Sequence, residues 1–192
     1  MREQGLRAMQ PRRFVPRTTD SRHGQRMSPN LLRERELRAD RPLKVLVGDI
    51  TYLPLRGGEW AYLATWLDLY SRKVVGWQVS ESMTAAIVTG ALRQALARQQ
   101  PARGLVVHSD RGGQYVATEF RELLGRQGFE QSMSRAGETY DNATAESFFS
   151  RYKAELLEGP AFEDVAQARA ETFAYIEGYY KPSSQCSFVL CP

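Results

Sequence analysis

The chain has 192 residues, enough for one ordinary domain with a short appendage, and 42% of them are hydrophobic, which suffices for a core. No apolar stretch approaches the ~20 residues that a membrane-spanning helix needs, and the arginine-rich N-terminus has no apolar segment of a signal peptide. Both cysteines lie among the last seven residues, which excludes a disulfide framework and a four-ligand zinc site and predicts a cytoplasmic protein.

Residues 1–43 predict a basic, extended arm. They contain eleven arginines and five acidic residues, a net charge of +6, whereas the rest of the chain has a net charge of −2. Prolines interrupt any long helix, so that only a short helix at 29–38 is expected, burying little by itself. A basic arm beside a near-neutral domain is typical of binding to a phosphate backbone, with Arg12, Arg13 and Arg17 as candidate contacts. A disordered, solubilising tail is the alternative.

Three strands begin the domain at 44–180. Residues 44–53, 59–69 and 73–80 are rich in β-branched and aromatic side chains, and short turns separate them. Consecutive strands with short connections predict an antiparallel meander. Residues 84–99 then change to helical spacing, with Thr84 as the expected N-cap.

Strand and helix alternate in the rest of the domain. A strand is expected at 105–108, a helix at 114–127 that Gly128 ends, and a fifth strand at 129–133. Two further helices are predicted at 142–157 and 163–180, the last burying Phe173, Ile176 and Tyr180. The order indicates an α/β fold with a mixed five-stranded sheet flanked by helices. Residues 181–192 do not continue the pattern and are expected to be a divergent, disordered tail.

Three acidic residues lie in settings that favour a metal site. Asp49 interrupts an apolar strand, where an unpaired charge is costly; a buried Asp that caps a backbone group is the alternative. Asp110 follows an apolar strand, at the carboxyl end where open α/β sheets place ligands, although a helix N-cap or turn Asp is by itself the more ordinary explanation. Glu146 lies in the first turns of a helix, where the helix dipole alone favours a Glu. Carboxylates are the ligands that hard divalent cations prefer.

Five blocks of sequence surround these acids and the turns between the strands. They are Val-Gly-Asp-Ile-Thr-Tyr at 47–52, Asp-Leu-Tyr-Ser-Arg-Lys-Val-Val-Gly-Trp at 68–77, His-Ser-Asp-Arg-Gly-Gly-Gln-Tyr at 108–115, Ser-Met-Ser-Arg-Ala-Gly at 132–137 and Tyr-Asp-Asn-Ala-Thr-Ala-Glu-Ser-Phe-Phe at 140–149. In this order they resemble the catalytic protein of bacterial insertion-sequence transposases (the second-frame, orfB-type protein) with a retroviral-integrase-like core. The resemblance implies a ribonuclease-H-like fold and a catalytic triad of Asp49, Asp110 and Glu146, the last two separated by 35 residues as that family favours.

The resemblance also implies the chemistry. The triad would hold two Mg²⁺ ions, for which Mn²⁺ could substitute, and use them in DNA strand cleavage and strand transfer, a phosphoryl transfer. Lys153, two helical turns after Glu146, is a candidate phosphate contact or a solvated surface lysine. Arg135, Gln114 and His108 are further DNA-binding candidates; Arg135 is otherwise a charge on a loop, and His108 otherwise satisfies a buried hydrogen bond.

Partners and alternatives follow from the same resemblance. Element ends and target are double-stranded DNA, two ends must be joined, and at least a homodimer on DNA is therefore expected, nucleoid-associated when bound. The N-terminus corresponds to the end of a helix-turn-helix region and the C-terminus diverges, which predicts a truncated remnant, active or inactive. Its end recognition is either lost or supplied by another, first-frame protein. Two other interpretations stay open: a metal-dependent nuclease of the same fold, and a non-catalytic DNA-binding or dimerisation fragment.

Overall fold

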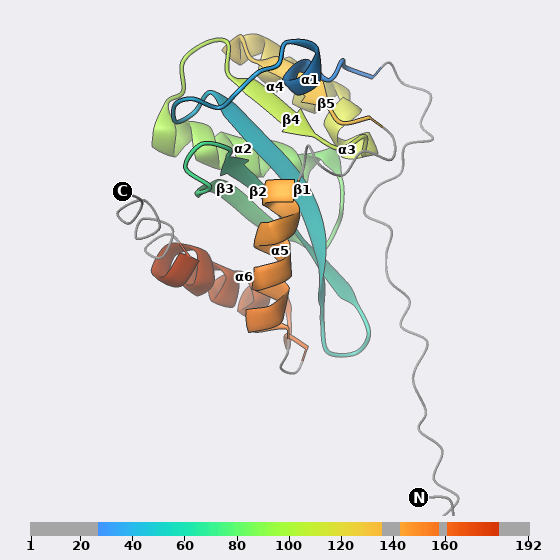
Figure 1. The fold of residues 1–192 in the computed structure, drawn as a ribbon. Helices are drawn as coiled ribbons and strands as arrows, with labels where there is room; N and C mark the ends of the chain where they lie inside the picture. The colour runs from blue at the N-terminus through green and yellow to red at the C-terminus, as the bar shows by residue number, and fades with distance from the viewer. Residues whose placement is uncertain (1–26, 136–142, 158–160, 181–192) are drawn as a thin grey trace, which may run out of the picture.

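A mixed five-stranded sheet forms the centre of the computed structural model, which describes residues 27–135, 143–157 and 161–180 (Figure 1). The strands are β1 (Val45–Pro54), β2 (Trp60–Asp68), β3 (Val74–Ser80), β4 (Val106–Ser109) and β5 (Glu130–Met133). Their spatial order is β3-β2-β1-β4-β5. The first three strands pair antiparallel, whereas β4 runs parallel to β1 and β5 parallel to β4. The predicted meander and the mixed five-stranded sheet are confirmed.

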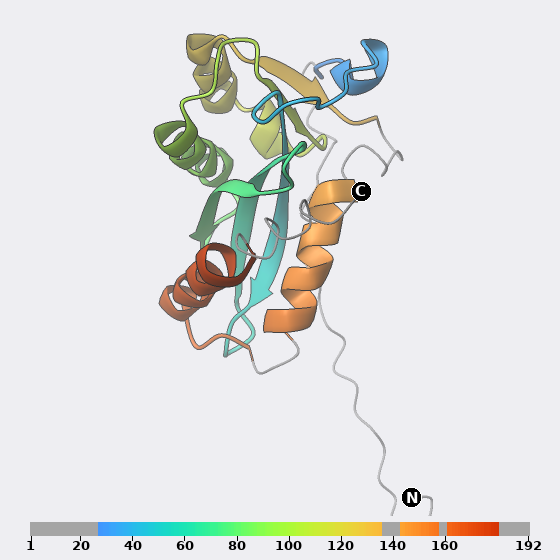
Figure 2. The same ribbon diagram turned by 60° about the vertical axis from the view of Figure 1, so that its left-hand side comes forward.

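Helices cover both faces of this sheet. On one face, α2 (Ala85–Gln99), α3 (Gly113–Val116) and α4 (Thr118–Gln127) enclose an apolar cluster centred on Trp66. On the other, α5 (Ala143–Leu156), α6 (Val165–Phe173) and a π-helix (Ala174–Tyr180) enclose a second cluster. Figure 2 shows α2 and α5 on opposite sides of the strands. No helix in the described part of the chain is long and apolar enough to cross a bilayer.

The single helix predicted at 114–127 is wrong, because it divides at Ala117 into α3 and α4. Ala117 has an extended backbone, with φ −59° and ψ 143°. In an unbroken helix the Tyr115 carbonyl would accept the amide of Glu119. It accepts instead from the side chain of Gln131, at 2.5 Å. This bond joins α3 to β5 and leaves the chain free to turn.

The last predicted helix also differs in its final turns. From Ala174 onward it widens into the π-helix, which buries Tyr175, Ile176 and Tyr180. Phe173, predicted to be in the core, is instead 54% exposed. Tyr175 is therefore buried in place of Phe173, and the number of buried apolar side chains is the same as predicted.

Residues 27–43, predicted as part of an extended arm, pack against the sheet. The short helix α1 (Leu31–Glu34) buries Leu31 with Val45 and Val106. The Leu31 amide donates to the Ser132 hydroxyl at 2.9 Å, and the Met133 amide donates to the Pro29 carbonyl at 3.1 Å. This segment therefore belongs to the folded core. Arg12, Arg13 and Arg17 lie outside the described residues, and so does the tail at 181–192.

Candidate active site

Two carboxylates are set side by side by the parallel pairing of β1 with β4. In that register Val47 is opposite His108 and Gly48 is opposite Ser109. Asp49 follows Gly48 within β1, and Asp110 directly follows the end of β4. The two acids therefore lie at the next position of adjacent strands, at the carboxyl end of β4 where open sheets place ligands. This is the place that the sequence predicted for Asp110.

A glycine beside Asp49 lets the strand pass over a tryptophan. A Cβ atom at Gly48 would overlap the indole ring of Trp66 from the neighbouring strand. The ring is held in place, because its N–H donates to the Val88 carbonyl at 3.0 Å and its face stacks on Phe120. Only glycine leaves room for this contact. The packing of Trp66 against Gly48 therefore fixes the β1 backbone next to Asp49.

Asp49 carries the strongest electrostatic signature of the site. Burial in the sheet raises the pKa of its carboxyl to about 7 from an ordinary value of 3.8. The negative charge of Asp110 raises the pKa further, and that of Glu146 adds a smaller increase. The Ile50 amide donates to the Asp49 carboxylate at 2.8 Å and lowers the pKa. Like charges that converge on one site are what a cation-binding or acid–base site shows.

Asp110 also shapes the turn that follows β4. Its Oδ1 accepts the Gly112 amide at 2.9 Å, which is the turn role that the sequence left open. A Cβ atom at Gly112 would press on this oxygen and on the Gln114 side chain. A carboxylate has about four lone-pair sites, so this bond does not prevent Asp110 from having other partners. Both interpretations of Asp110 are therefore compatible in one geometry.

Glu146 projects from the opposite side of the site, on α5. It lies in the first turn of that helix and is exposed. Its charge reaches Asp49, but no three His, Cys, Asp or Glu side chains converge as a metal-binding group anywhere in the described ranges. The pair Asp49 and Asp110 fits a hard cation by donor type and by mutual repulsion. Glu146 fits by donor type, but in the described structure it does not form a three-residue metal-binding group with them.

Lys153 lies within electrostatic reach of Asp49. It is partly buried, and its Nζ lies 4.5 Å from the centre of the Tyr52 ring. Burial lowers the pKa of its ammonium, and the charge of Asp49 opposes that effect. A cation held over an aromatic ring next to a carboxylate is positioned at low entropic cost. The helical spacing from Glu146 predicted a phosphate contact for Lys153, and that contact stays a prediction.

The other predicted DNA contacts differ in accessibility. His108 is fully buried and shares a 2.8 Å hydrogen bond with the Ser132 hydroxyl, so the alternative of a buried hydrogen bond fits it and direct contact with DNA does not. Gln114 is partly buried, and its amide donates to the Met83 carbonyl at 3.2 Å. Arg135 is exposed at the end of a described range.

Sequence reasoning did not single out Tyr115, which lies beneath the acids. Its ring is fully buried against Trp66 and Phe120, and its hydroxyl has no hydrogen-bond partner among the described residues. Burial, Asp110 and Asp49 all raise the pKa of this hydroxyl. The sequence signal for Tyr115 was its place in the block at 108–115. It follows Asp110 by five residues, and the short helix that begins between them brings its side chain back toward that acid.

Family models and relatives agree with this geometry. A model described as integrase core domain matches residues 39–139, and a second integrase core domain model matches residues 127–181. The chain belongs to the integrase core domain family. It is 44% identical over 180 residues to the transposase InsF for insertion sequence IS3A of Escherichia coli (strain K12), a match that covers 94% of this chain and 62% of that protein. The predicted resemblance to insertion-sequence transposases is confirmed.

A transposase from a second bacterium supports the same assignment. The transposase for insertion sequence element IS904 of Lactococcus lactis subsp. lactis (strain IL1403) is 43% identical over 152 residues, 79% of this chain and 59% of that protein. The chain therefore spans less than two thirds of the length of these relatives.

Two solved catalytic cores show the fold. The catalytic domain of Mos1 mariner transposase superposes with a TM-score of 0.58 at 15% identity, covering 71% of each chain. The HTLV-2 integrase catalytic core domain in complex with magnesium has a TM-score of 0.53 at 17% identity, covering 74% of this chain and 91% of that one. Identities this low speak for the fold alone, and they confirm the ribonuclease-H-like architecture.

Proposed function

We propose that this chain is the catalytic core of a DNA transposase that cleaves and joins DNA strands with divalent metal ions. The observation that carries the proposal is the pairing of Asp49 with Asp110 on adjacent strands, where each charge disfavours the other. Membership of the integrase core domain family gives this pair its context. Glu146 is the third carboxylate, on the helix that faces the pair.

The residues have separate tasks in this proposal. Asp49 and Asp110 would hold Mg²⁺, or Mn²⁺ in its place, and Glu146 would complete the ligand set. When bound there, two divalent cations supply positive charge to the attacking and the leaving oxygens of a phosphoryl transfer. Lys153, held over Tyr52, donates to a non-bridging oxygen of the DNA phosphate and fixes its orientation. Its cation also offsets the negative charge that the DNA brings.

The raised pKa of Asp49 describes the protein without a metal ion. A group with a pKa of about 7 is half protonated at neutral pH. Deprotonation is needed before a carboxylate binds a cation, so metal affinity should rise with pH across this range. The acidic pair is thus poised to exchange a proton for a metal ion.

The domain organisation and partners belong to the same proposal. The arm residues within 1–26, which carry a net charge of +5, add sequence-independent affinity for duplex DNA. The substrates are two element ends and a target, so the working form is at least a dimer. The HTLV-2 integrase catalytic core domain has been solved in a dimeric and a trimeric form. A first-frame helix-turn-helix protein would supply end recognition.

The test uses a branched duplex that imitates the product of strand transfer. Because a catalyst accelerates a reaction in both directions, the core should rejoin such a substrate without recognising an element end. The full 192-residue chain is incubated with labelled branched DNA in Mg²⁺, in Mn²⁺ and in EDTA. We expect a rejoined strand that depends on the metal. Cut strands without rejoining would indicate the nuclease alternative, and retention of DNA without any product would indicate the binding fragment.

A further inference from the structure

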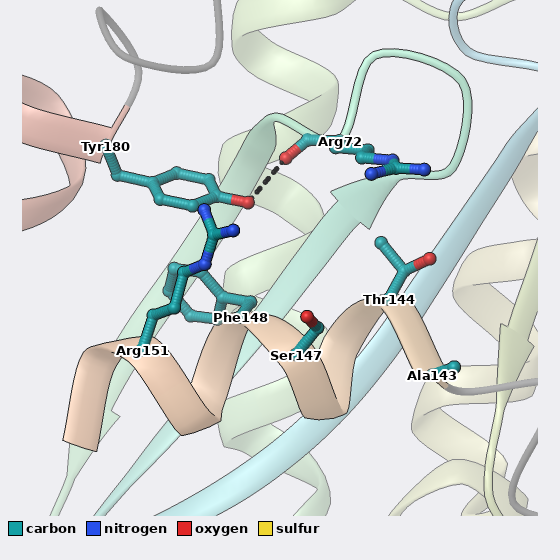
Figure 3. A pocket seen from close by; sticks show the side chains of 7 residues that line it. All are labelled: Arg72, Ala143, Thr144, Ser147, Phe148, Arg151 and Tyr180. Atoms are coloured by element: carbon teal, nitrogen blue, oxygen red, sulfur yellow. Dashed lines mark hydrogen bonds between the residues drawn. The ribbon is translucent and has the colours of Figure 1, made fainter. Parts of the chain in front are cut away.

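A basic pocket lies on the side of α5 next to the candidate active site. It is a cavity of about 240 Å³ between the start of α5, the turn that joins β2 to β3, and the end of the π-helix (Figure 3). Its lining residues are Arg72, Ala143, Thr144, Ser147, Phe148, Arg151 and Tyr180. Neither the triad nor Lys153 is among them. The pocket is therefore a separate site on the same helix.

The polar lining of this pocket consists of hydrogen-bond donors and positive charge. Figure 3 shows the guanidinium of Arg151 below the Tyr180 ring, with the side chains of Ser147 and Thr144 along the same helix. No acidic side chain lines the pocket within the described ranges, and neither Arg72 nor Arg151 has an ion-pair partner there. Both cations oppose the effect of burial on the pKa of the Tyr180 hydroxyl. A group with several negative oxygens would satisfy all of these donors.

The turn that carries Arg72 is held firmly. Arg72 has a left-handed backbone, with φ 58°, which is unfavourable for a residue other than glycine. The buried Asp68 carboxylate accepts the amides of Leu43 and Ser71, each at 3.0 Å, and the Asp68 carbonyl accepts the Arg72 amide at 2.7 Å. The Tyr180 hydroxyl donates to the Arg72 carbonyl at 2.9 Å. The bonds on both sides of Arg72 fix the position of its backbone at the edge of the pocket.

The spacing on α5 connects the pocket with the site. Glu146 and Lys153, seven residues apart, share one face of the helix, whereas Ser147 and Arg151, four apart, share the next face round. A DNA strand bound at the first face would pass over the second. Arginine forks and hydroxyls match phosphate oxygens and carry no information about base sequence.

We propose that the pocket of Arg72 and Arg151 binds a backbone phosphate of the DNA whose reacting phosphate lies at Asp49 and Asp110. This inference rests on the proposed function and adds a second anchoring point for its substrate. The two arginines each neutralise part of one phosphate site, and Ser147 and Thr144 donate hydrogen bonds to its oxygens. The anchor fixes the direction in which the duplex crosses α5, whatever its sequence.

Salt dependence of DNA binding tests this directly. The affinity of the full chain for a labelled duplex is measured in EDTA over a range of salt concentrations, so that no reaction takes place. Because the two arginines share one phosphate, the double variant of Arg72→Gln and Arg151→Gln should make the slope of log affinity against log salt shallower by about 1. Each single variant should make the slope shallower by a smaller amount. Arg126→Gln on α4, which removes the same charge from a surface ion pair with Glu122, should keep the wild-type slope.

The outcomes separate the anchor from its alternatives. A wild-type slope for the folded Arg151→Gln variant would overturn the proposal, and this variant is decisive because the Arg151 side chain makes no hydrogen bond that folding requires in the described structure. In a second arm, inorganic phosphate is titrated. If it binds wild type but not the double variant while the DNA slopes are equal, the pocket takes free phosphate and the DNA anchor is wrong. Failure of catalysis would appear only in Mg²⁺, as a wild-type chain that forms no rejoined product.

Discussion

Asp110 lies beside Asp49 across the parallel pairing of β4 with β1, and its negative charge contributes to raising the pKa of Asp49 to about 7. Two acids at the same level of adjacent strands repel each other in the absence of a cation. The protein tolerates this repulsion although burial disfavours the charged form of Asp49. The cost should be measurable as a dependence of stability on pH.

The first prediction concerns that cost. Because the folded-state pKa of Asp49 lies above its unfolded value of 3.8, the folded protein holds an extra proton between about pH 4 and pH 7. The free energy of unfolding should therefore fall as pH rises through this window, by at most about 4 kcal/mol from this group. Urea unfolding at pH 5 and pH 8 in EDTA measures the change.

The matched variant is Asp49→Asn, which keeps the size of the side chain and removes its titration. It should lose most of the pH dependence and be more stable than wild type at pH 8. Glu59→Gln, at an exposed position in the turn before β2, should behave like wild type. A wild-type protein that grows more stable from pH 5 to pH 8 while Asp49→Asn does the same would contradict the assignment.

The second prediction separates the N-terminal arm from the core. Deletion of residues 1–26 removes a net charge of +5 and should make the salt dependence of DNA binding shallower without changing the thermal midpoint. Deletion of residues 1–43 should also lower the midpoint, because it removes Leu31 from Val45 and Val106. Equal midpoints for the two deletions would mean that α1 contributes no stability.

The third prediction concerns the C-terminal end of the core. Truncation after Lys181 should leave the thermal midpoint nearly unchanged, whereas Tyr180→Phe should destabilise by about 1 kcal/mol through loss of its hydrogen bond to the Arg72 carbonyl. Differential scanning calorimetry of the three proteins provides the comparison. A truncated chain that melts several degrees lower would show that residues 182–192 dock on the core.

The fourth prediction concerns Lys153. Lys153→Gln should slow strand joining by about tenfold to a hundredfold, because a charge-assisted bond to the phosphate is lost at the reacting group. Lys153→Arg should recover part of the rate, since it restores a cation over Tyr52. Single-turnover rates with saturating DNA separate this effect from binding. Identical rates for all three proteins would return Lys153 to an ordinary surface role.

Much of the sheet was predictable because its signals are local. Alternating and continuous apolar runs indicated all five strands, and the end of the run at 105–108 placed Asp110 where the structure has it. Long-range contacts were not predictable. The sequence near Ala117 does not show that the Gln131 side chain donates to the Tyr115 carbonyl. Likewise, the sequence near Leu31 does not show that the Leu31 amide donates to the Ser132 hydroxyl.

The candidate site divides in the same way. Asp49 and Asp110 follow from strand patterns, whereas the distance of Glu146 from them depends on how α5 packs across the sheet. The burial of His108 likewise depends on α1 and β5, which cover β4 from segments far away in sequence. The pocket of Arg72 and Arg151 joins residues 79 positions apart and could not be found from spacing alone.

The most direct test of the central claim is rejoining of the branched duplex by the three charge-neutral variants Asp49→Asn, Asp110→Asn and Glu146→Gln. Each should lower the Mg²⁺-dependent rate by about a hundredfold or more, since each removes one metal ligand, while thermal unfolding shows that the fold is kept. Glu155→Gln, an exposed position on the same helix, should retain the wild-type rate. A near-normal rate for any one of the three variants in Mg²⁺ would contradict the triad of Asp49, Asp110 and Glu146.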